Sequence, residues 1–245
     1  MSAERLAELI VSSGPVVALT GAGISVPSGI PDFRTPGKGI WENVDPMEVA
    51  HISVWRRDPA RFWSFYGQRF ALLDGKQPNG AHFALAELER RGLLSGVITQ
   101  NIDGLHAAAG TVDPIEVHGS IRTASCLSCG ASYSLAETRQ RGELPRCDCG
   151  APLKPDVVLF GEFLPEAAMA RASSLASSAG LMLAIGSSLE VWPVAQLPAD
   201  TLDAGGQLAL VTMGPTPYDS EAVVKLSGDV EEELSAVVAA LPAAP

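Results

Sequence analysis

The chain has 245 residues and a mass of 25.5 kDa, with 47% hydrophobic residues, 18% charged residues and a formal net charge of −11. This composition excludes a disordered or coiled-coil protein and is typical of one compact globular unit. The acidic balance argues against a generic nucleic-acid binder, since phosphate contacts need clustered Lys and Arg. No stretch approaches the roughly 18 apolar residues of a membrane helix, and the charged residues 1–15 do not resemble a signal peptide. We therefore expect a cytoplasmic protein.

Apolar runs that alternate with amphipathic stretches predict the secondary structure. A helix over 3–12 precedes a buried strand over 16–19, which ends at Thr20-Gly21. Further strands are expected over 95–99, 157–160, 181–185 and 208–212, and further helices over 59–74, 80–91 and 165–178. Asp58 and Asn79 are the predicted N-caps of the first two of these helices. Strands that alternate with helices indicate an α/β fold with a Rossmann-like, doubly wound parallel sheet.

The first motif, Gly21-Ala22-Gly23-Ile24-Ser25, directly follows the first predicted strand. Glycines here let the backbone approach a pyrophosphate, and the helix N-terminus that follows supplies N–H donors. The alternative is a plain tight turn. Hydride-transfer enzymes place an acidic residue about 20 residues further on, whereas here Pro27 and Pro31 prevent a regular helix. The sequence therefore predicts a long loop that folds over a bound nucleotide.

Polar residues end the second predicted strand, in the segment Thr99-Gln100-Asn101-Ile102-Asp103-Gly104-Leu105-His106. Ligands of open α/β sheets bind at the carboxyl ends of strands, so this segment is a candidate ligand site. The alternative is a cluster that caps the next helix through Asn101 or Asp103. His118 is a candidate general base, because histidine titrates near neutral pH. The alternative there is a structural, hydrogen-bonding histidine.

All four cysteines lie close together, as Cys126-x2-Cys129 and Cys147-x-Cys149 with 17 residues between the pairs. Such pairs are typical of a tetrahedral, structural zinc site, although the second pair is one residue shorter than usual. Two disulfides are the alternative. We expect a small inserted zinc-binding lobe made of residues 46–92 (helical) and 122–154 (zinc ribbon). The large Rossmann-like part would then take residues 1–45, 93–121 and 155–245.

Together these motifs resemble the sirtuin family of NAD-dependent protein lysine deacylases. The matching segments are GAGISVPSGIPDFR at 21–34, TQNIDGLH at 99–106, His118-Gly119, the cysteine pairs, VVLFGE at 157–162 and GSSLEVWP at 186–193. They occur in the family's order over nearly the whole chain. The resemblance implies NAD as co-substrate and acylated lysines of proteins or peptides as substrate. It also implies one structural zinc ion, held by Cys126, Cys129, Cys147 and Cys149.

The resemblance further implies roles for individual residues. The catalytic residues are His118, as the general base, and Asn101. NAD is bound by Gly21, Ala22, Gly23, Ser25, Asp32, Phe33, Arg34, Gln100, Asn101, Ile102, Asp103, Gly186, Ser187, Ser188, Thr212, Asp229 and Val230. Thr212 stands where many members have an adenosine-contacting Asn, so that contact is expected to be weaker or made by the backbone. The peptide would lie as an added strand against Val158, Phe160, Gly161, Glu190 and Val191.

In the implied reaction, the acyl oxygen of the substrate attacks C1′ of the nicotinamide ribose as nicotinamide leaves. His118 helps to deprotonate a ribose hydroxyl, and water completes the release of lysine and O-acyl-ADP-ribose. A protein mono-ADP-ribosyltransferase that uses the same NAD site is the alternative activity. A non-catalytic zinc-ribbon scaffold is a third hypothesis, against which the complete NAD loop and His118 argue.

Tyr66 and Arg69 lie three residues apart on the predicted helix 59–74 and therefore share a face. With Ala50, they resemble the sirtuin branch that removes succinyl, malonyl or glutaryl groups. Arg grips a carboxylate bidentately, Tyr adds a hydroxyl donor, and a small alanine leaves room for a longer acyl chain. Alternatively, Arg69 pairs with a surface carboxylate and Tyr66 packs against neighbouring aromatic rings. We expect removal of acidic acyl groups as well as of acetyl.

Overall fold

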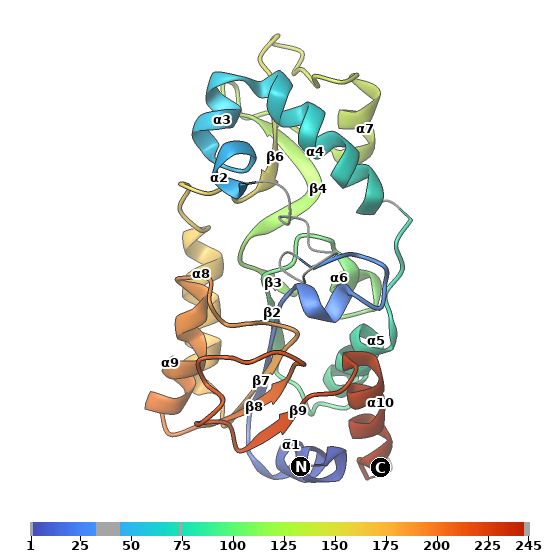
Figure 1. Ribbon diagram of the computed structural model, residues 1–245, viewed down its shortest axis with the longest axis vertical. Helices are drawn as coiled ribbons and strands as arrows, with labels where there is room; N and C mark the ends of the chain where they lie inside the picture. Colours follow the sequence, from blue (N-terminus) through green and yellow to red (C-terminus); the bar gives the residue numbers. More distant parts are fainter. Residues whose placement is uncertain (1, 33–44, 74, 243–245) are drawn as a thin grey trace.

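The computed structural model describes residues 2–32, 45–73 and 75–242, which form a large part on a six-stranded sheet and a small part on a three-stranded sheet (Figure 1). The strands are β1 (Val16–Thr20), β2 (Gly96–Thr99), β3 (Ile115–Glu116), β4 (Gly119–Cys126), β5 (Ser132–Ser134), β6 (Leu153–Val157), β7 (Leu181–Ile185), β8 (Gln207–Val211) and β9 (Val224–Leu226). The α-helices are α1 (Ala3–Ser12), α2 (Pro46–Val49), α3 (Ile52–Arg57), α4 (Pro59–Leu73), α5 (Gly80–Arg90), α6 (Leu105–Ala108), α7 (Leu135–Gln140), α8 (Glu166–Ser178), α9 (Leu197–Asp203) and α10 (Val230–Ala240). Short 3-10 helices are η1 (Ala22–Ser25) and η2 (Val194–Gln196). Over these described ranges, no helix is both long and apolar enough to cross a membrane.

The large sheet is parallel throughout, in the order β3-β2-β1-β7-β8-β9. Four of the predicted strands are its central members β1, β2, β7 and β8, which confirms the doubly wound α/β fold. From β1 the chain continues to β2 and β3 on one side, and from β7 it continues to β8 and β9 on the other side, so the strand order reverses between β1 and β7. Sheets of this kind bind ligands at such a switch point, outside the carboxyl ends of the strands.

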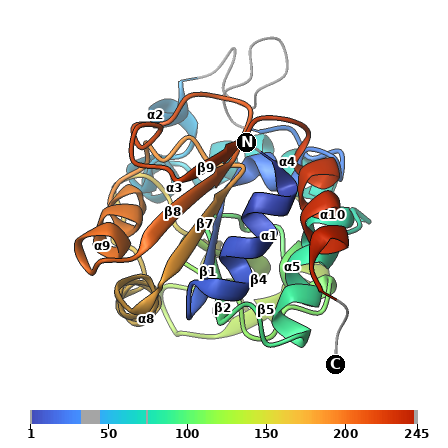
Figure 2. The ribbon, with the colours of Figure 1, turned by 90° about the horizontal axis from the view of Figure 1, so that it is seen from below.

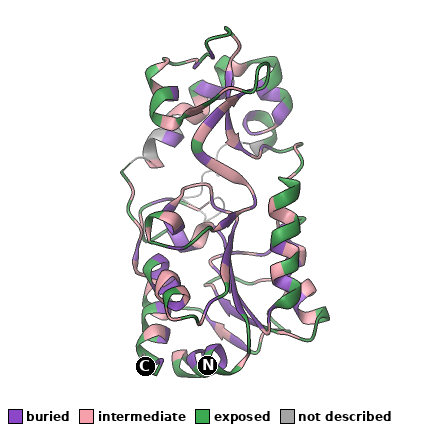
Figure 3. Ribbon diagram, turned by 180° about the vertical axis from the view of Figure 1, so that it is seen from behind, coloured by how far each residue is buried: buried purple, intermediate pink, exposed green. Residues whose placement is uncertain are grey.

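Helices cover both faces of the large sheet, as Figure 2 shows from below. On one face α1, α5 and α10 bury Leu6, Leu85 and Leu234 against β1 and β7, and on the other α8 and α9 bury Ala172 and Leu197. Full burial of one leucine side chain is worth roughly 1.5–3 kcal/mol of transfer free energy. Figure 3 shows the result, with buried strands lying between helices whose outer faces are exposed. This rigid sheet supports the loops at its carboxyl edge.

Helix α5 does not lie in the small lobe, although the expected domain bounds assigned all of 46–92 to that lobe. Its apolar residues Ala81, Leu85 and Leu88 recur at i, i+4 and i+7 and are buried in the core that α1 and α10 share. The helix therefore lies with the large sheet. From that stretch, only α2, α3 and α4 lie beside the small sheet (Figure 1).

The predicted parallel strand over 157–160 is wrong. Strand β6 covers Leu153–Val157 instead and pairs antiparallel with β4 in the small sheet. The next residues belong to no strand: the N–H of Val158 donates to the His118 carbonyl at 2.8 Å, and that of Phe160 donates to the Ala50 carbonyl at 3.0 Å. Leu159 is buried among the aromatic side chains of α3 and α4 whereas Phe160 is exposed, so the apolar run serves the small part's core.

Candidate active site

Three strands of the large sheet end side by side and bring three predicted segments together. Thr20 of β1 pairs with Thr99 of β2 and with Ile185 of β7, so the residues that follow each strand meet at one edge. The sequence segments after these strands are 21–25, 100–103 and 186–188. In Figure 1 this edge faces the small part, and η1 and α6 lie between the two parts.

Glycines bring the first and third of these segments into contact. The N–H of Gly23 donates to the Gly186 carbonyl at 2.8 Å, and a Cβ on Gly23 would lie only 2.7 Å from the Gly186 Cα. Gly186 also has a left-handed backbone (φ +59°), which favours glycine. A Cβ at either position would collide with the facing backbone, so only glycine lets the two segments pack this closely. These packed glycine segments form a cradle at the carboxyl ends of the strands, which is where parallel sheets of this kind bind a pyrophosphate.

A polar network joins the first and second segments. Asn101 Nδ2 lies 3.1 Å from both the Gly21 carbonyl and Ser25 Oγ, and the Ser25 hydroxyl donates to Asp103 Oδ2 at 2.7 Å. Asp103 Oδ1 also accepts from the Leu105 N–H at 2.9 Å, which is the first N–H of α6, although the N-cap residue of this helix is Gly104 and not Asn101 or Asp103. This bond to the helix start and the ligand-site interpretation are compatible. Asn101 is buried, which fixes its amide at the strand end.

Gln100 connects the second segment to the third and to His118. Its Nε2 donates to Ser187 Oγ at 3.0 Å, and its carbonyl lies 3.0 Å from His118 Nδ1. Because a carbonyl only accepts, Nδ1 carries the proton and Nε2 of the neutral ring keeps its lone pair. Burial lowers the pKa of His118, against a smaller opposing effect of the Gln100 hydrogen bond. His118 is therefore neutral at pH 7 and has the form that a general base needs.

The remaining predicted NAD residues lie within these three segments or elsewhere along the chain. Ala22, Ile102 and Ser188 belong to the three segments, and Ile102 accepts the Ile121 N–H at 3.1 Å. Beyond them, the Thr212 N–H donates to the Leu226 carbonyl at 3.0 Å, and the Asp229 carboxylate caps α10. Val230 and Asp32 are buried and half-buried respectively. The predicted residues Phe33 and Arg34 lie outside the described part of the chain.

The predicted peptide-binding segment lies next to Ala50. The Ile52 N–H donates to the Phe160 carbonyl at 2.9 Å, which completes a two-way backbone pairing around His51. Within the described residues, the N–H and carbonyl of Gly161 and the N–H of Val191 have no hydrogen-bond partner. Val158 and Val191 are half-buried, and Gly161 and Glu190 are exposed. Both segments thus offer backbone groups to an added strand.

The ring of Tyr66 packs against neighbouring aromatic rings of its own helix, α4, as one of the two interpretations of Tyr66 expected. Its ring stacks on Phe62 with centroids 4.7 Å apart and lies 5.3 Å from Phe70. The cluster also holds Ile102 and Leu159, so it lies between the predicted NAD segment and the predicted peptide segment. Arg69 follows on the same helix, one turn further, and its side chain lies outside the described part.

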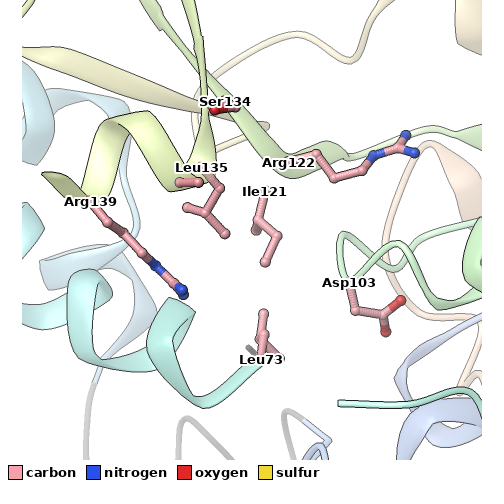
Figure 4. A pocket seen from close by; sticks show the side chains of 8 residues that line it. Leu73, Asp103, Ile121, Arg122, Ser134, Leu135 and Arg139 are labelled. Carbon is pink, nitrogen blue, oxygen red and sulfur yellow. The ribbon is translucent and has the colours of Figure 1, made fainter. Parts of the chain in front are cut away.

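A cavity of about 420 Å³ adjoins Asp103 on the side of the small part (Figure 4). The residues that line it are Leu73, Asp103, Ile121, Arg122, Ser134, Leu135, Ala136 and Arg139. Arg122 pairs with Glu116 at 2.5 Å, and Arg139 Nη2 donates to the Phe70 carbonyl at 2.8 Å. Because the guanidinium groups are already engaged, the cavity extends the space beside Asp103 rather than forming a separate charged site.

Thr20, Asn79, His82 and His106 are buried polar residues directly behind the site. Sequence reasoning placed Thr20, Asn79 and His106 in its predicted segments but missed His82. His82 is the third residue of α5 and forms a capping box with Asn79. The spacing Asn-x-x-His at a predicted helix start was the available signal, but His is an unusual partner in such a box, where Glu or Gln is common.

The four cysteines come together as the spacing predicted. Their Sγ atoms all lie within 4.8 Å of one another, and the closest pairs, Cys126–Cys149 and Cys129–Cys147, are 3.5 Å apart. A tetrahedron of Zn–S bonds of about 2.3 Å has S–S edges near 3.8 Å, whereas a disulfide is about 2.05 Å long. The geometry fits a zinc ion, and the short Cys147-x-Cys149 spacing is accommodated by a tight turn in which the Gly150 N–H donates to the Cys147 carbonyl at 2.8 Å.

Replacement of Cys147 by serine is expected to release about one zinc ion per chain and to lower the thermal stability of the small part. The reason is that metal binding supplies folding free energy to a lobe with a small core. Elemental analysis and a melting curve measure both effects, with Ser128→Ala as an exposed control between ligands. Wild-type protein that contains no zinc, although purified without chelator, would contradict the assignment.

The family model, the curated relatives and the solved structures that match this chain all belong to one protein family. Residues 21–193 match the Sir2 family. The chain is 46% identical over 240 residues to an NAD-dependent protein deacetylase of Sulfolobus acidocaldarius, covering 96% of this chain and 94% of that protein. It is 41% identical over 241 residues to an NAD-dependent protein deacylase of Thermococcus sibiricus, covering 94% of each. A solved structure described as Sir2 with p53 peptide and NAD+ matches at a TM-score of 0.90, with 40% identity over 98% of both chains.

Proposed function

Because the chain belongs to the Sir2 family, it is an NAD-dependent protein deacylase, and we propose that it acts on acyl-lysine and accepts succinyl and malonyl as well as acetyl groups. One observation carries the proposal. A neutral His118, bonded through Nδ1 to Gln100, stands beside a glycine cradle at the switch point of the sheet. The proposal thus puts the base beside the strand ends at which NAD would bind.

NAD would occupy the cradle at the three strand ends. The pyrophosphate would lie against the segments of Gly21, Gly23 and Gly186, which pack backbone to backbone, and Gln100 holds the Ser187 hydroxyl beside them. Asp103, fixed by Ser25, would accept the carboxamide N–H of nicotinamide. When bound, NAD would supply the electrophilic C1′ of its nicotinamide ribose and the ribose hydroxyl that takes up the acyl group.

His118 would act on a ribose hydroxyl. Its Nε2 lone pair accepts the proton, and the Gln100 carbonyl stabilises the positive ring that results. The buried Asn101 amide keeps the adjacent backbone in place through Gly21 and Ser25. Base and ribose are thereby held in a fixed geometry, which removes much of the entropic cost of the reaction.

The acyl-lysine peptide would add a strand to the free backbone groups of Gly161 and Val191. Its lysine would then enter between that strand and the cluster around Tyr66. Ala50 is buried where it bonds to Phe160 and, as a small residue, leaves space for a longer acyl group. Arg69 and Tyr66 would bind the distal carboxylate of succinyl or malonyl groups.

A protein mono-ADP-ribosyltransferase remains the second candidate, since it needs the same NAD site. The test incubates acetyl-lysine peptide with NAD labelled in its adenosine part. Deacylation places the label in a small-molecule product and frees the lysine. Label on protein with the acyl group still on the peptide would overturn the proposal in favour of ADP-ribosyl transfer.

A further inference from the structure

The N-terminus of α5 forms the wall behind the glycine loop. Asn79 Nδ2 donates to the Ile24 carbonyl at 2.8 Å and to Ser28 Oγ at 3.0 Å, so the cap residue of α5 holds the loop that follows β1. His82, the third residue of the helix, is fully buried, and its Nε2 lies 3.5 Å from Ser25 Oγ of the same loop. The helix start is therefore joined to the predicted NAD loop by two side chains.

The directions of the surrounding hydrogen bonds determine which ring nitrogen of His82 carries the proton. The Ser25 hydroxyl donates its proton to Asp103 at 2.7 Å, so at its other contacts Ser25 Oγ only accepts. It accepts from Asn101 Nδ2 at 3.1 Å and from His82 Nε2 at 3.5 Å. His82 Nδ1 accepts the Asn79 N–H at 3.4 Å and so carries no proton. The ring is thus neutral, with its proton on Nε2.

A second buried histidine completes this layer. His106 lies with its ring centroid 4.9 Å from that of His82, and its Nε2 is 2.9 Å from Thr20 Oγ1. Burial, with a smaller effect of His82, lowers the pKa of His106 to about 3. Burial also lowers the pKa of His82, although Asp103 and Glu231 act in the opposite direction. Both rings are therefore neutral near pH 7 and place no cation behind the site.

We infer that His82 is a positioning residue. Its Nδ1 accepts the Asn79 N–H and its Nε2–H donates to Ser25 Oγ, which keeps the Ser25 hydroxyl on Asp103 and thereby orients the carboxylate that would bind nicotinamide. The inference rests on the proposed function, which assigns the nicotinamide carboxamide to Asp103. Without the donor at His82, Ser25 Oγ keeps its contact with Asn101 Nδ2 but loses its second donor, so the Ser25 hydroxyl is held less firmly on Asp103. The effect should fall on the nicotinamide half of NAD and spare the ADP-ribose half.

Two substitutions separate positioning from packing. In His82→Gln the amide offers an acceptor to Asn79 and a donor to Ser25, and Gln is a common third residue of a capping box. In His82→Leu both groups are lost while the bulk is kept. We expect His82→Leu to raise the Kd for NAD about tenfold, the usual effect of one lost hydrogen bond. His82→Gln should stay within about threefold of wild type.

Calorimetric titration with NAD and with ADP-ribose is the measurement, since ADP-ribose lacks nicotinamide. Its Kd should be unchanged in both variants. Glu137→Leu, which removes the equivalent residue from the capping box of α7, controls for the loss of a helix cap and should alter neither Kd. Equal weakening of NAD and ADP-ribose in His82→Leu, or a His82→Gln variant as weak as His82→Leu, would overturn the inference. A wild type that binds NAD but deacylates nothing would refute the proposed function and leave this test valid.

Discussion

His118→Ala is expected to lower kcat for deacylation by about 10²- to 10⁴-fold, the usual cost of losing a general base. The structure gives the reason, since His118 is held neutral by burial and presents Nε2 while Nδ1 bonds to Gln100. Initial rates with an acetyl-lysine peptide at saturating NAD measure the loss. Because the pKa is lowered, wild-type activity should stay constant as the pH falls through about 7 and decline only below the ordinary histidine range near 6.5.

The control for His118→Ala is a check that the variant is folded like the wild type. His118 is half-buried at the start of β4, and its replacement by alanine leaves the hydrophobic clusters intact. The melting temperature and zinc content should therefore remain close to wild type. A variant that is folded and turns over at the wild-type rate would show that another group takes the proton.

Arg69→Met is expected to lower kcat/KM for succinyl-lysine far more than for acetyl-lysine. Loss of a charge-assisted pair in a partly dry pocket removes roughly 2–5 kcal/mol, or about 30- to several-thousand-fold in kcat/KM. The acetyl substrate has no carboxylate to lose, so its kcat/KM should change little or rise. The ratio of kcat/KM for the two peptides, in variant and wild type, is the measurement.

Arg61→Met on the same helix is the control, because Arg61 is exposed and lies two turns before Arg69. It should leave both substrates unchanged. Parallel losses on both substrates in Arg69→Met would instead mean that Arg69 supports the fold of α4. The acidic-acyl assignment would then be withdrawn, and NAD-dependent deacetylation would stand.

Most of the large sheet was predictable from the sequence because its strands are buried on both faces. The continuous apolar runs at 16–19 and 181–185 predict strands of a parallel sheet, and both are fully buried strands in the structure. The run at 157–160 has the same composition but packs one face against aromatic residues of α4. Composition alone does not distinguish these two environments, and the prediction failed there.

The candidate site was predictable where the motif itself carries the geometry. Glycines at 21, 23 and 186 and cysteine pairs at fixed spacing allow few arrangements, and the structure brings each set together. The layer behind the site was not predictable, because His82 and His106 are far apart in sequence and meet only through the packing of α5 on α6. Their chemistry depends on hydrogen-bond direction, which no spacing encodes.

The most direct test of NAD-dependent deacylation is the ratio of NAD consumed to lysine freed. An acetyl-lysine peptide is incubated with the protein, with and without NAD, and nicotinamide, free lysine peptide and O-acetyl-ADP-ribose are quantified by mass spectrometry. We expect the three products in about equal amounts and no free lysine without NAD. Deacetylation that proceeds without NAD, or NAD cleavage that frees no lysine, would contradict the account.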